Sequence, residues 1–420
     1  KLLGRKRTWV PEPAHLYIDE ADFALLDLGV GRHEWELGEL GRGKQAKLAA
    51  QTRAAESIAL ELHPVERGVS GGHFRRTGTL SVQLTREGIK FIRDQYRINL
   101  RAPWNRTMRR RVEAALVAEH LAQRDVHYKV IGDEIQIVDL SRGRILEGHH
   151  WRGGLQAAVQ QKEFGEPRSD SRHMRRTNIR SLVDETRKAG KDVAGTTGTL
   201  GDENDIRRFA DLGFETMRVR PDTKVYRVDK TFWYATGDER DVGLMQSAYE
   251  AHKAGRPVVV AAANDRAAMK LAATFREMGI FVRELLAHHS LDYEDAIVGT
   301  AGLPYAFTVT TRRLSRGTDV LNGGDPAWVA RLRLRERGID ESHNNYRSLY
   351  EREYKKARAE VERYVEALNY EGGGLLVVIQ EKPGSKRWED QLRGRAGRNG
   401  FPGESQLFAS AEGETLRSPT

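Results

Sequence analysis

The sequence predicts an α/β protein built on a parallel sheet, and two observations support this fold class. Residues 257–263 and 374–379 are almost wholly apolar runs, which is typical of strands that are buried on both faces. Strand and helix patterns also alternate from about residue 200 to residue 410, which is the order that parallel strands with crossover helices require. Within this region we expect further strands at 281–285 and 306–311, and a helix over 265–278.

The first half of the chain predicts a short buried strand and then a mixed α and β region. The strand ends at Ile18, directly before Asp19. Thr85 precedes a helical pattern and carries a hydroxyl that suits a helix N-cap. Further elements are expected as helices over 37–62, 106–123, 151–163 and 172–188, a strand over 79–84, and a hairpin that joins 128–131 to 135–138 through Gly132-Asp133.

Composition limits the classes of protein and site. The 420 residues include 69 Lys and Arg against 60 Asp and Glu, so the formal net charge of +9 favours an anionic partner such as nucleic acid, acidic lipid or nucleotide phosphate. The chain has no cysteine, which excludes disulfides and thiolate zinc sites within it. No apolar run reaches the length of a membrane-spanning helix. The chain begins at Lys1 rather than Met, and we expect it to be a piece of a longer polypeptide.

An acidic motif follows the first predicted strand. Asp19 and Glu20 stand where a carboxylate can hold Mg²⁺ and a second carboxylate can polarise an attacking water. A carboxylate pair after a strand is also common by chance, so this motif alone does not decide between a catalytic and a solvated turn.

A segment rich in arginine and glycine lies near the other end of the chain. In Gln391-Leu-Arg-Gly-Arg-Ala-Gly-Arg398, the glycines allow tight turns, so that Arg395 and Arg398 can point to one place. Guanidinium groups offer planar paired donors that suit phosphate oxygens. The alternative is a basic loop that contacts nucleic acid or lipid. Because the two motifs are far apart in sequence, we expect a nucleotide site between two domains.

Two further segments have weaker signals. Residues 195–199, Gly-Thr-Thr-Gly-Thr, carry small hydroxyl side chains that can couple two domains by hydrogen bonds. Residues 315–319, Ser-Arg-Gly-Thr-Asp, follow a predicted parallel strand, and such loops line ligand crevices. Each segment is equally readable as an ordinary turn.

Taken together, these segments resemble the SecA family of preprotein translocase ATPases. Four motifs of a helicase-like motor occur in order, at 19–22, 195–199, 316–319 and 391–398. That order also suits a DEAD-box RNA helicase. The intervening stretches favour SecA: 124–163 is similar to the segment where the family's preprotein-binding domain returns to the first motor domain, and 316–326 is similar to its motif with a Gly-Gly tail.

The resemblance implies two RecA-like motor domains, of which the first is partial, and an inserted α+β preprotein-binding domain. The implied division is 1–36 with 149–198 for the first RecA-like domain, 37–148 for the insertion, 199–410 for the second RecA-like domain with a helical insertion at 326–370, and 411–420 as a tail.

The resemblance also implies ATP and Mg²⁺ as cofactors and assigns four catalytic residues. Asp19 would be the metal ligand and Glu20 the general base. Arg395 and Arg398 would act as arginine fingers on the γ-phosphate.

Four further residues would bind the nucleotide in the family pattern. They are Gln391, Arg316, Gly317 and Asp319. No Gly-Lys-Thr phosphate loop precedes Asp19, and residues 312–315 read Arg-Arg-Leu-Ser where the family usually has Asn-Met-Ala-Gly, which we expect to weaken coupling between domains or to mark a divergent paralogue.

The family pattern implies an ATP-driven export motor that works on the cytoplasmic face of the inner membrane as a peripheral protein. Its implied partners are an unfolded preprotein, the translocon channel, an acidic phospholipid surface and a second copy of the chain, whereas nucleic acid is not expected. Two alternatives stay open: an RNA-stimulated ATPase of the helicase type, and a fragment that binds partners without hydrolysing ATP.

Overall fold

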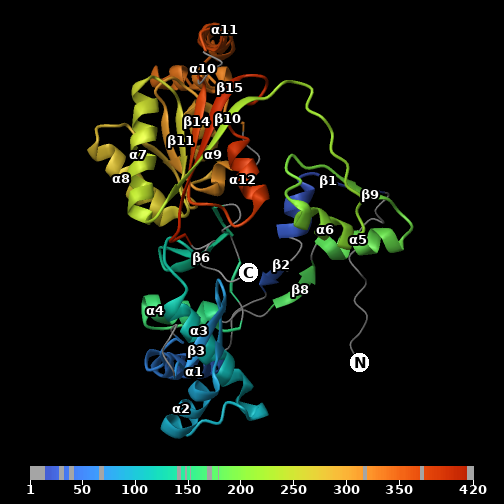
Figure 1. The fold of residues 1–420 in the computed structure, drawn as a ribbon, viewed down its shortest axis with the longest axis vertical. Helices are drawn as coiled ribbons and strands as arrows, with labels where there is room; N and C mark the ends of the chain where they lie inside the picture. The colour runs from blue at the N-terminus through green and yellow to red at the C-terminus, as the bar shows by residue number, and fades with distance from the viewer. Residues whose placement is uncertain are drawn as a thin grey trace.

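The computed structural model describes residues 15–27, 33–36, 42–65, 71–139, 143–146, 149–151, 153–167, 173–177, 179–315, 319–368 and 373–413. Figure 1 shows three parts. We call residues 226–413 the sheet domain, residues 42–164 the helical lobe, and the group formed by residues 15–27 and 179–214 the small lobe. The small lobe lies beside helix α12 of the sheet domain, and the helical lobe lies below that domain in the view (Figure 1).

The sheet domain contains a six-stranded sheet in which every neighbouring pair is parallel, and this confirms the predicted fold class. The order is β10-β15-β14-β11-β13-β12. The bounds are β10 (Tyr226–Tyr234), β11 (Val258–Ala261), β12 (Arg283–Leu285), β13 (Phe307–Thr310), β14 (Leu375–Gln380) and β15 (Pro402–Ser410).

Helices cover both faces of this sheet because the inner strands are apolar on both sides. Helices α7 (Gly237–Lys253) and α8 (Asp265–Glu277) form one core with Val258, Val260 and their neighbours. Helix α9 (Leu291–Ala301) and the end of α12 (Lys386–Arg393) form the second core, which includes Val259 and Val377. The helical insertion consists of α10 (Pro326–Glu336) and α11 (Tyr346–Glu366), at the top of Figure 1.

The helical lobe has its own core, formed mainly by α1 (Arg42–Leu60), α3 (Arg106–His120) and α4 (Leu155–Phe164). Thr85 caps α2 (Arg86–Tyr96) as predicted, because its Oγ1 accepts a hydrogen bond from Gly88 N at 3.0 Å. The strands are β3 (Phe74–Gly78) with β4 (Ser81–Leu84), and the predicted hairpin of β5 (Tyr128–Ile131) and β6 (Glu134–Asp139), extended by β7 (Arg144–Ile145).

The small lobe pairs the two segments that carry the first predicted motifs. Strand β1 (Leu16–Ile18) lies parallel to β9 (Val193–Gly195). A π-helical turn, η1 (Phe23–Asp27), follows β1 and buries four apolar side chains against α5 (Ile179–Lys188) and α6 (Glu203–Asp211). The motifs at 19–22 and 195–199 therefore meet at the carboxyl end of one strand pair.

One predicted helix is partly wrong. We expected a helix over 172–188, but residues 173–177 form strand β8 (His173–Thr177), which pairs antiparallel with β2 (His33–Glu36), and the helix begins at Ile179. The partner strand lies far away in sequence, so the local pattern did not contain the deciding interaction. In the described part of the chain, no helix combines the length and apolarity needed to cross a bilayer.

Candidate active site between the small lobe and helix α12

Asp22 lies at the centre of the contact between the small lobe and the sheet domain. It is fully buried, and its two carboxylate oxygens accept hydrogen bonds from Thr197 Oγ1 at 2.7 Å and Thr199 Oγ1 at 3.2 Å. Arg387 Nη1 lies 3.3 Å from Asp22 Oδ2. A buried carboxylate is stable only when it is paired and hydrogen-bonded, so Asp22 holds the 195–199 turn and α12 together.

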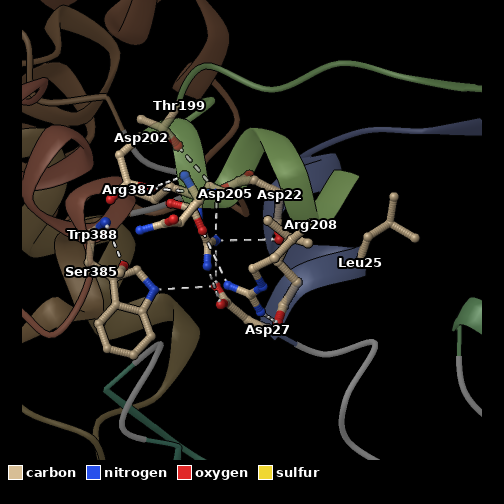
Figure 2. Close-up of polar contacts among 12 residues, drawn as sticks. Asp22, Leu25, Asp27, Thr199, Asp202, Asp205, Arg208, Ser385, Arg387 and Trp388 are labelled. Atoms are coloured by element: carbon tan, nitrogen blue, oxygen red, sulfur yellow. Dashed lines mark hydrogen bonds and ion pairs between the residues drawn. The ribbon is translucent and has the colours of Figure 1, made fainter. Parts of the chain in front are cut away.

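Arg387 crosses from α12 into a group of three carboxylates, as Figure 2 shows. Its Nη2 donates to Asp27 Oδ1 at 2.8 Å, and its Nε lies 3.0 Å from Asp205 Oδ1 on α6. Burial by itself lowers the pKa of Arg387, but hydrogen bonds and charge from Asp27, together with Asp205, outweigh burial and raise the pKa. The guanidinium therefore stays charged although the residue is 1% exposed.

A second hydrogen-bond path joins the same two parts. Gln391 Nε2 donates to Thr199 Oγ1 at 2.8 Å, and the Thr199 hydroxyl donates onward to Asp22. Gln391 and Arg387 are four residues apart, so they share one face of α12. The hydroxyl coupling that we predicted for residues 195–199 is thus present.

Trp388 extends this contact to the loop that departs from the family pattern. Its Nε1 donates to Asp27 Oδ2 at 3.2 Å. The Arg312 guanidinium lies 4.2 Å from the centroid of the Trp388 ring, which is a cation–π arrangement. Burial lowers the pKa of Arg312 to about 10, whereas the charges of Asp139 and Asp27 raise it. The side chain therefore remains charged at neutral pH.

The neighbouring Arg313 connects the same loop to the helical lobe through Glu294 of the sheet domain. Its guanidinium donates to Glu294 Oε2 at 2.9 Å and to backbone carbonyls of residues 286–290. Arg144 of β7 pairs with the other oxygen of Glu294. Gly143 has a φ of +63°, and a Cβ there would lie 2.4 Å from Thr311 Oγ1, so the β6–β7 turn sits directly on this loop.

The structure places the two predicted catalytic carboxylates directly after the carboxyl end of β1. Asp19 is exposed, and its Oδ1 accepts a hydrogen bond from the Glu20 backbone N at 2.9 Å. Glu20 is half-buried and has a φ of +49°, an uncommon conformation for a residue with a side chain. Tyr17 OH donates to Thr196 Oγ1 at 3.0 Å and so braces the facing turn.

The predicted arginine fingers follow α12, four and seven residues after Gln391. Arg395 is 6% exposed. Arg398 lies at the surface, where its Nη1 pairs with Asp319 at 3.0 Å, so two predicted residues from different motifs are in contact. Arg316 and Gly317 lie outside the described residues. Asp19 and Glu20 follow β1 in the small lobe, whereas the Arg398–Asp319 pair belongs to the sheet domain.

The donor set at β1 fits a magnesium ion. Mg²⁺ takes oxygen ligands, and in nucleotide sites it is held by one or two carboxylates with the remaining positions left to phosphate and water. Asp19 provides one exposed carboxylate of this kind. Among the described residues, no group of three or more His, Cys, Asp or Glu side chains could hold a metal ion by itself. A cavity of about 310 Å³ elsewhere in the small lobe is lined by Leu25, Arg180 and Phe214 and by none of the predicted site residues.

Sequence reasoning missed most of the residues that form the contact. The sequence patterns did not indicate Asp27, Asp205 or Arg387 as site residues. The spacing of Arg387 and Gln391, four residues apart on a capped helix, is the one local signal that could have indicated a shared face.

The fold and the site together define a class of α/β protein in which a lobe is inserted between the first acidic motif and the parallel-sheet domain that carries the arginines. Comparison with known proteins agrees. A family model described as SecA P-loop domain matches residues 224–419, and one described as SecA preprotein cross-linking domain matches residues 51–160. The chain belongs to the SecA family.

Similar proteins support this assignment over most of the chain. The protein translocase subunit SecA of Micrococcus luteus is 30% identical over 417 residues, covering 97% of this chain and 43% of that protein. The SecA of Chloroflexus aggregans is 31% identical over 418 residues, covering 97% and 40%. The SecA of Hydrogenobaculum sp. is 33% identical over 343 residues, covering 80% and 35%. The chain thus spans less than half the length of these relatives.

Proposed function

We propose that this chain is the central part of an ATP-hydrolysing preprotein translocase motor, which couples ATP binding and hydrolysis to the export of unfolded preproteins through a membrane channel. The observation that carries the proposal is the path from Gln391 through Thr199 to Asp22, because it connects the arginine-bearing segment with the acidic motif. The names of the relatives, protein translocase subunit SecA, support the transport role.

In this proposal, Asp19 holds Mg²⁺, which would neutralise charge that develops on the phosphates, and Glu20 accepts a proton from the attacking water. Arg398 and Arg395 donate to γ-phosphate oxygens. Arg398 must then exchange its ion pair with Asp319 for phosphate, and an exposed pair of this kind costs little to break.

A second group of residues would bind the nucleotide itself. We propose Gln391, Arg316, Gly317 and Asp319 for this role. Gln391 already lies at the contact between the two parts, and Asp319 already pairs with a proposed arginine finger.

We also propose the domain division given by the family pattern, 1–36 with 149–198, 37–148, 199–410 and the tail 411–420, with one revision at the return point after residue 148. The packing of α4 on α1 and α3, and the match of the preprotein cross-linking model up to residue 160, favour a return point later than residue 148. The preprotein would lie beside the helical lobe, where main-chain hydrogen bonding accepts many sequences.

An ATPase assay tests the proposal. We expect ATP hydrolysis by the complete polypeptide that contains this chain to rise when translocon vesicles and an unfolded preprotein are added together. Glu20→Gln should abolish this rise while nucleotide binding persists, and Arg398→Ala should lower the rate roughly 1,000-fold, as loss of an arginine finger does. Stimulation by single-stranded RNA in place of preprotein would instead identify the RNA-dependent ATPase.

A binding measurement tests the third alternative. If residues 1–420 alone bind ATP with micromolar affinity, the chain is more than a scaffold for partners. No change in ATPase rate with preprotein, translocon or RNA, together with no binding of ATP, would contradict the motor function.

A further inference from the structure

A chain of polar contacts joins strand β10, at the edge of the sheet, to the end of helix α12. Arg227 donates to both carboxylate oxygens of Asp229, at 2.7 Å and 2.9 Å. Asp229 Oδ1 also accepts a hydrogen bond from Ser405 Oγ of β15, and the same Oγ accepts one from Arg393 Nη1 at 2.9 Å. We call these four residues the β10 network. It connects the edge strand with the last residue of α12.

Arg393 fixes the chain directly before residues 394–398, which we call the finger turn. Its side chain is almost fully buried. Nη1 also donates to Lys230 O at 3.2 Å, Nη2 donates to Thr231 Oγ1 at 2.9 Å, and Nε donates to Glu389 Oε1 at 2.9 Å. One planar guanidinium thus binds β10, β15 and its own helix, which a lysine ammonium cannot reproduce. The entry to the finger turn is therefore fixed in direction as well as in place.

The finger turn also packs directly on the two strands. Gly397 stands between Arg395 and Arg398 and has a φ of +67°, and a Cβ there would lie 2.6 Å from Arg227 Cβ. A Cβ on Gly403 of β15 would lie 2.3 Å from Gly397 N. Carbon atoms pack at about 3.5–4.0 Å, so neither position has room for a side chain. The backbone of the turn therefore rests on Arg227 and on β15.

Both proposed fingers depend on this support because the turn is closed internally. Ala396 N donates to Arg393 O at 3.1 Å, and Arg398 Nε donates to Gly394 O at 2.8 Å. Arg395 lies between these contacts in sequence and is almost fully buried. A displacement of Arg393 would therefore move both fingers.

Asp229 stays ionised within the β10 network. Burial alone raises the pKa of its carboxyl, but hydrogen bonds from Arg227 and Ser405, together with the charges of Arg227 and Arg393, outweigh burial and lower the pKa. The negative charge also stabilises the two arginines, which would repel each other beside a neutral side chain. A change at Asp229 therefore acts on the whole network.

We propose that Arg227 and Asp229 are positioning residues for the arginine fingers. With the rest of the β10 network, they hold the finger turn in the orientation from which both fingers reach a γ-phosphate, and neither residue touches the nucleotide. The inference rests on the proposed function, which supplies the reaction in which the fingers act. Arginine fingers stabilise charge in the transition state, so their orientation affects the rate of hydrolysis more than the affinity for ATP.

Support of strand β10 alone does not account for the network. All nine residues of β10 are already paired with β15. Lys230, whose side chain lies on the opposite face of the strand from Asp229, pairs with Glu404 at 2.7 Å. The strand thus carries one ion pair that leads to the finger turn and another on its other face, and the second provides a matched control.

Amide hydrogen exchange in the 420-residue chain tests the contacts without ATP. Asp229→Asn keeps the size of the side chain but removes its charge. It should speed exchange over residues 394–400 roughly tenfold, because hydrogen bonds to a charged group are weakened. Lys230→Gln should change exchange there less than about twofold. Circular dichroism establishes that both variants are folded. Unchanged exchange in Asp229→Asn, or an equal rise in both variants, would overturn the proposal.

Kinetics of the complete polypeptide test whether the network acts through the fingers. Asp229→Asn should lower kcat for ATP roughly 10- to 100-fold and change KM less than about twofold. In a chain that already carries Arg398→Ala, the same substitution should lower kcat less than about threefold, because residues that act as a unit are not additive. A full further loss in that background would overturn the proposal, as would a rise in KM with kcat unchanged.

The two proposals fail in different ways. If Arg398→Ala alone leaves the ATPase rate unchanged, the proposed fingers are wrong and the inference falls with them, even where exchange shows that the network holds the turn. If Arg398→Ala lowers the rate but Asp229→Asn does not, the proposed function stands and the positioning role of β10 is wrong.

Discussion

Asp19, Glu20 and Asp22 belong to one short motif but occupy different environments. Asp19 is exposed and Glu20 half-buried, so both can meet a ligand. Asp22 is fully buried and accepts hydrogen bonds from Thr197, Thr199 and Arg387. This difference assigns a structural role to the third carboxylate, because a group whose acceptor sites are already taken has little capacity for metal or water.

Arg387 provides the first prediction. Arg387→Ala removes the cation shared by Asp22, Asp27 and Asp205, and leaves three carboxylates close together at a buried contact. Breaking a buried pair on one side costs about 3–5 kcal/mol. We expect the small lobe to separate from α12, seen as faster amide hydrogen exchange in both η1 and α12.

Arg208→Ala is the control for this prediction. Arg208 also contacts Asp205, at 3.2 Å, and donates to Leu26 O, but both partners lie within the small lobe. It should therefore leave exchange in α12 unchanged. If the two variants speed exchange in α12 equally, Arg387 does not hold the two parts together.

At the scale of elements, the eight-residue helix α12 contacts both the small lobe and the sheet. Ser385 caps its start, accepting from Trp388 N at 3.3 Å. Arg387 and Gln391 face the small lobe. Arg393, two residues beyond Gln391, instead donates to Ser405 Oγ of β15 at 2.9 Å and to β10, and so fixes the helix on the sheet. The segment that carries the proposed fingers thus starts from a firmly placed helix end.

The sequence was informative where local pattern and burial coincide. Strands β11 and β14 could be predicted because both of their faces are apolar, and Thr85 could be predicted as a cap from its position. Edge strand β10 mixes exposed polar and apolar side chains and gave no such pattern. Strand β8 was taken for helix because its partner β2 lies far away in sequence. The same limit applies to the site. The coupling by Thr199 was predicted, but the role of Arg387 depends on three carboxylates that other elements supply.

Glu404 of β15 gives a prediction about pH. Burial alone raises the pKa of this carboxyl, but hydrogen bonds from Lys230, Gln406 and Arg256 outweigh it and lower the pKa to about 2, from the usual 4.5. Because the folded-state pKa is the lower one, this stabilisation is complete above pH 4.5 and is lost as pH falls towards 2. At about 1.4 kcal/mol per pKa unit, it should amount to roughly 3 kcal/mol.

The variant Glu404→Gln should therefore be less stable than the parent at neutral pH and should lose less stability on acidification. Urea unfolding followed between pH 5 and pH 2.5 measures this difference. Glu412→Gln, at an exposed turn after the same strand, is the control and should keep the slope of the parent. Parallel slopes for Glu404→Gln and the parent would contradict the prediction.

At the scale of the whole molecule, the loop 311–315 is connected to all three parts, to the small lobe through Trp388. Arg312 belongs to the sheet domain and stacks on Trp388, whose indole bonds Asp27 of the small lobe. The charge of Asp139, at the end of β6 in the helical lobe, raises the pKa of Arg312 and so opposes the effect of burial. We expected the departure from Asn-Met-Ala-Gly to weaken coupling between domains or to mark a divergent paralogue, but these contacts favour a gain of coupling at this loop.

The last prediction follows from this position. Arg312→Asn removes both the stacked cation and its charge, and a cation–π contact that is shielded from water is worth about 1–2 kcal/mol. We expect amide exchange to rise roughly tenfold in β6–β7 and in η1 together, because one side chain supports both contacts.

Arg266→Ala is the comparison: Arg266 donates to Arg124 O at 2.7 Å and so joins the helical lobe to the sheet domain alone. It should speed exchange around residues 123–130 and leave η1 unchanged. If Arg312→Asn speeds exchange in only one of its two neighbours, the helical lobe and the small lobe are held independently, and movement of one would not be transmitted to the other through this loop.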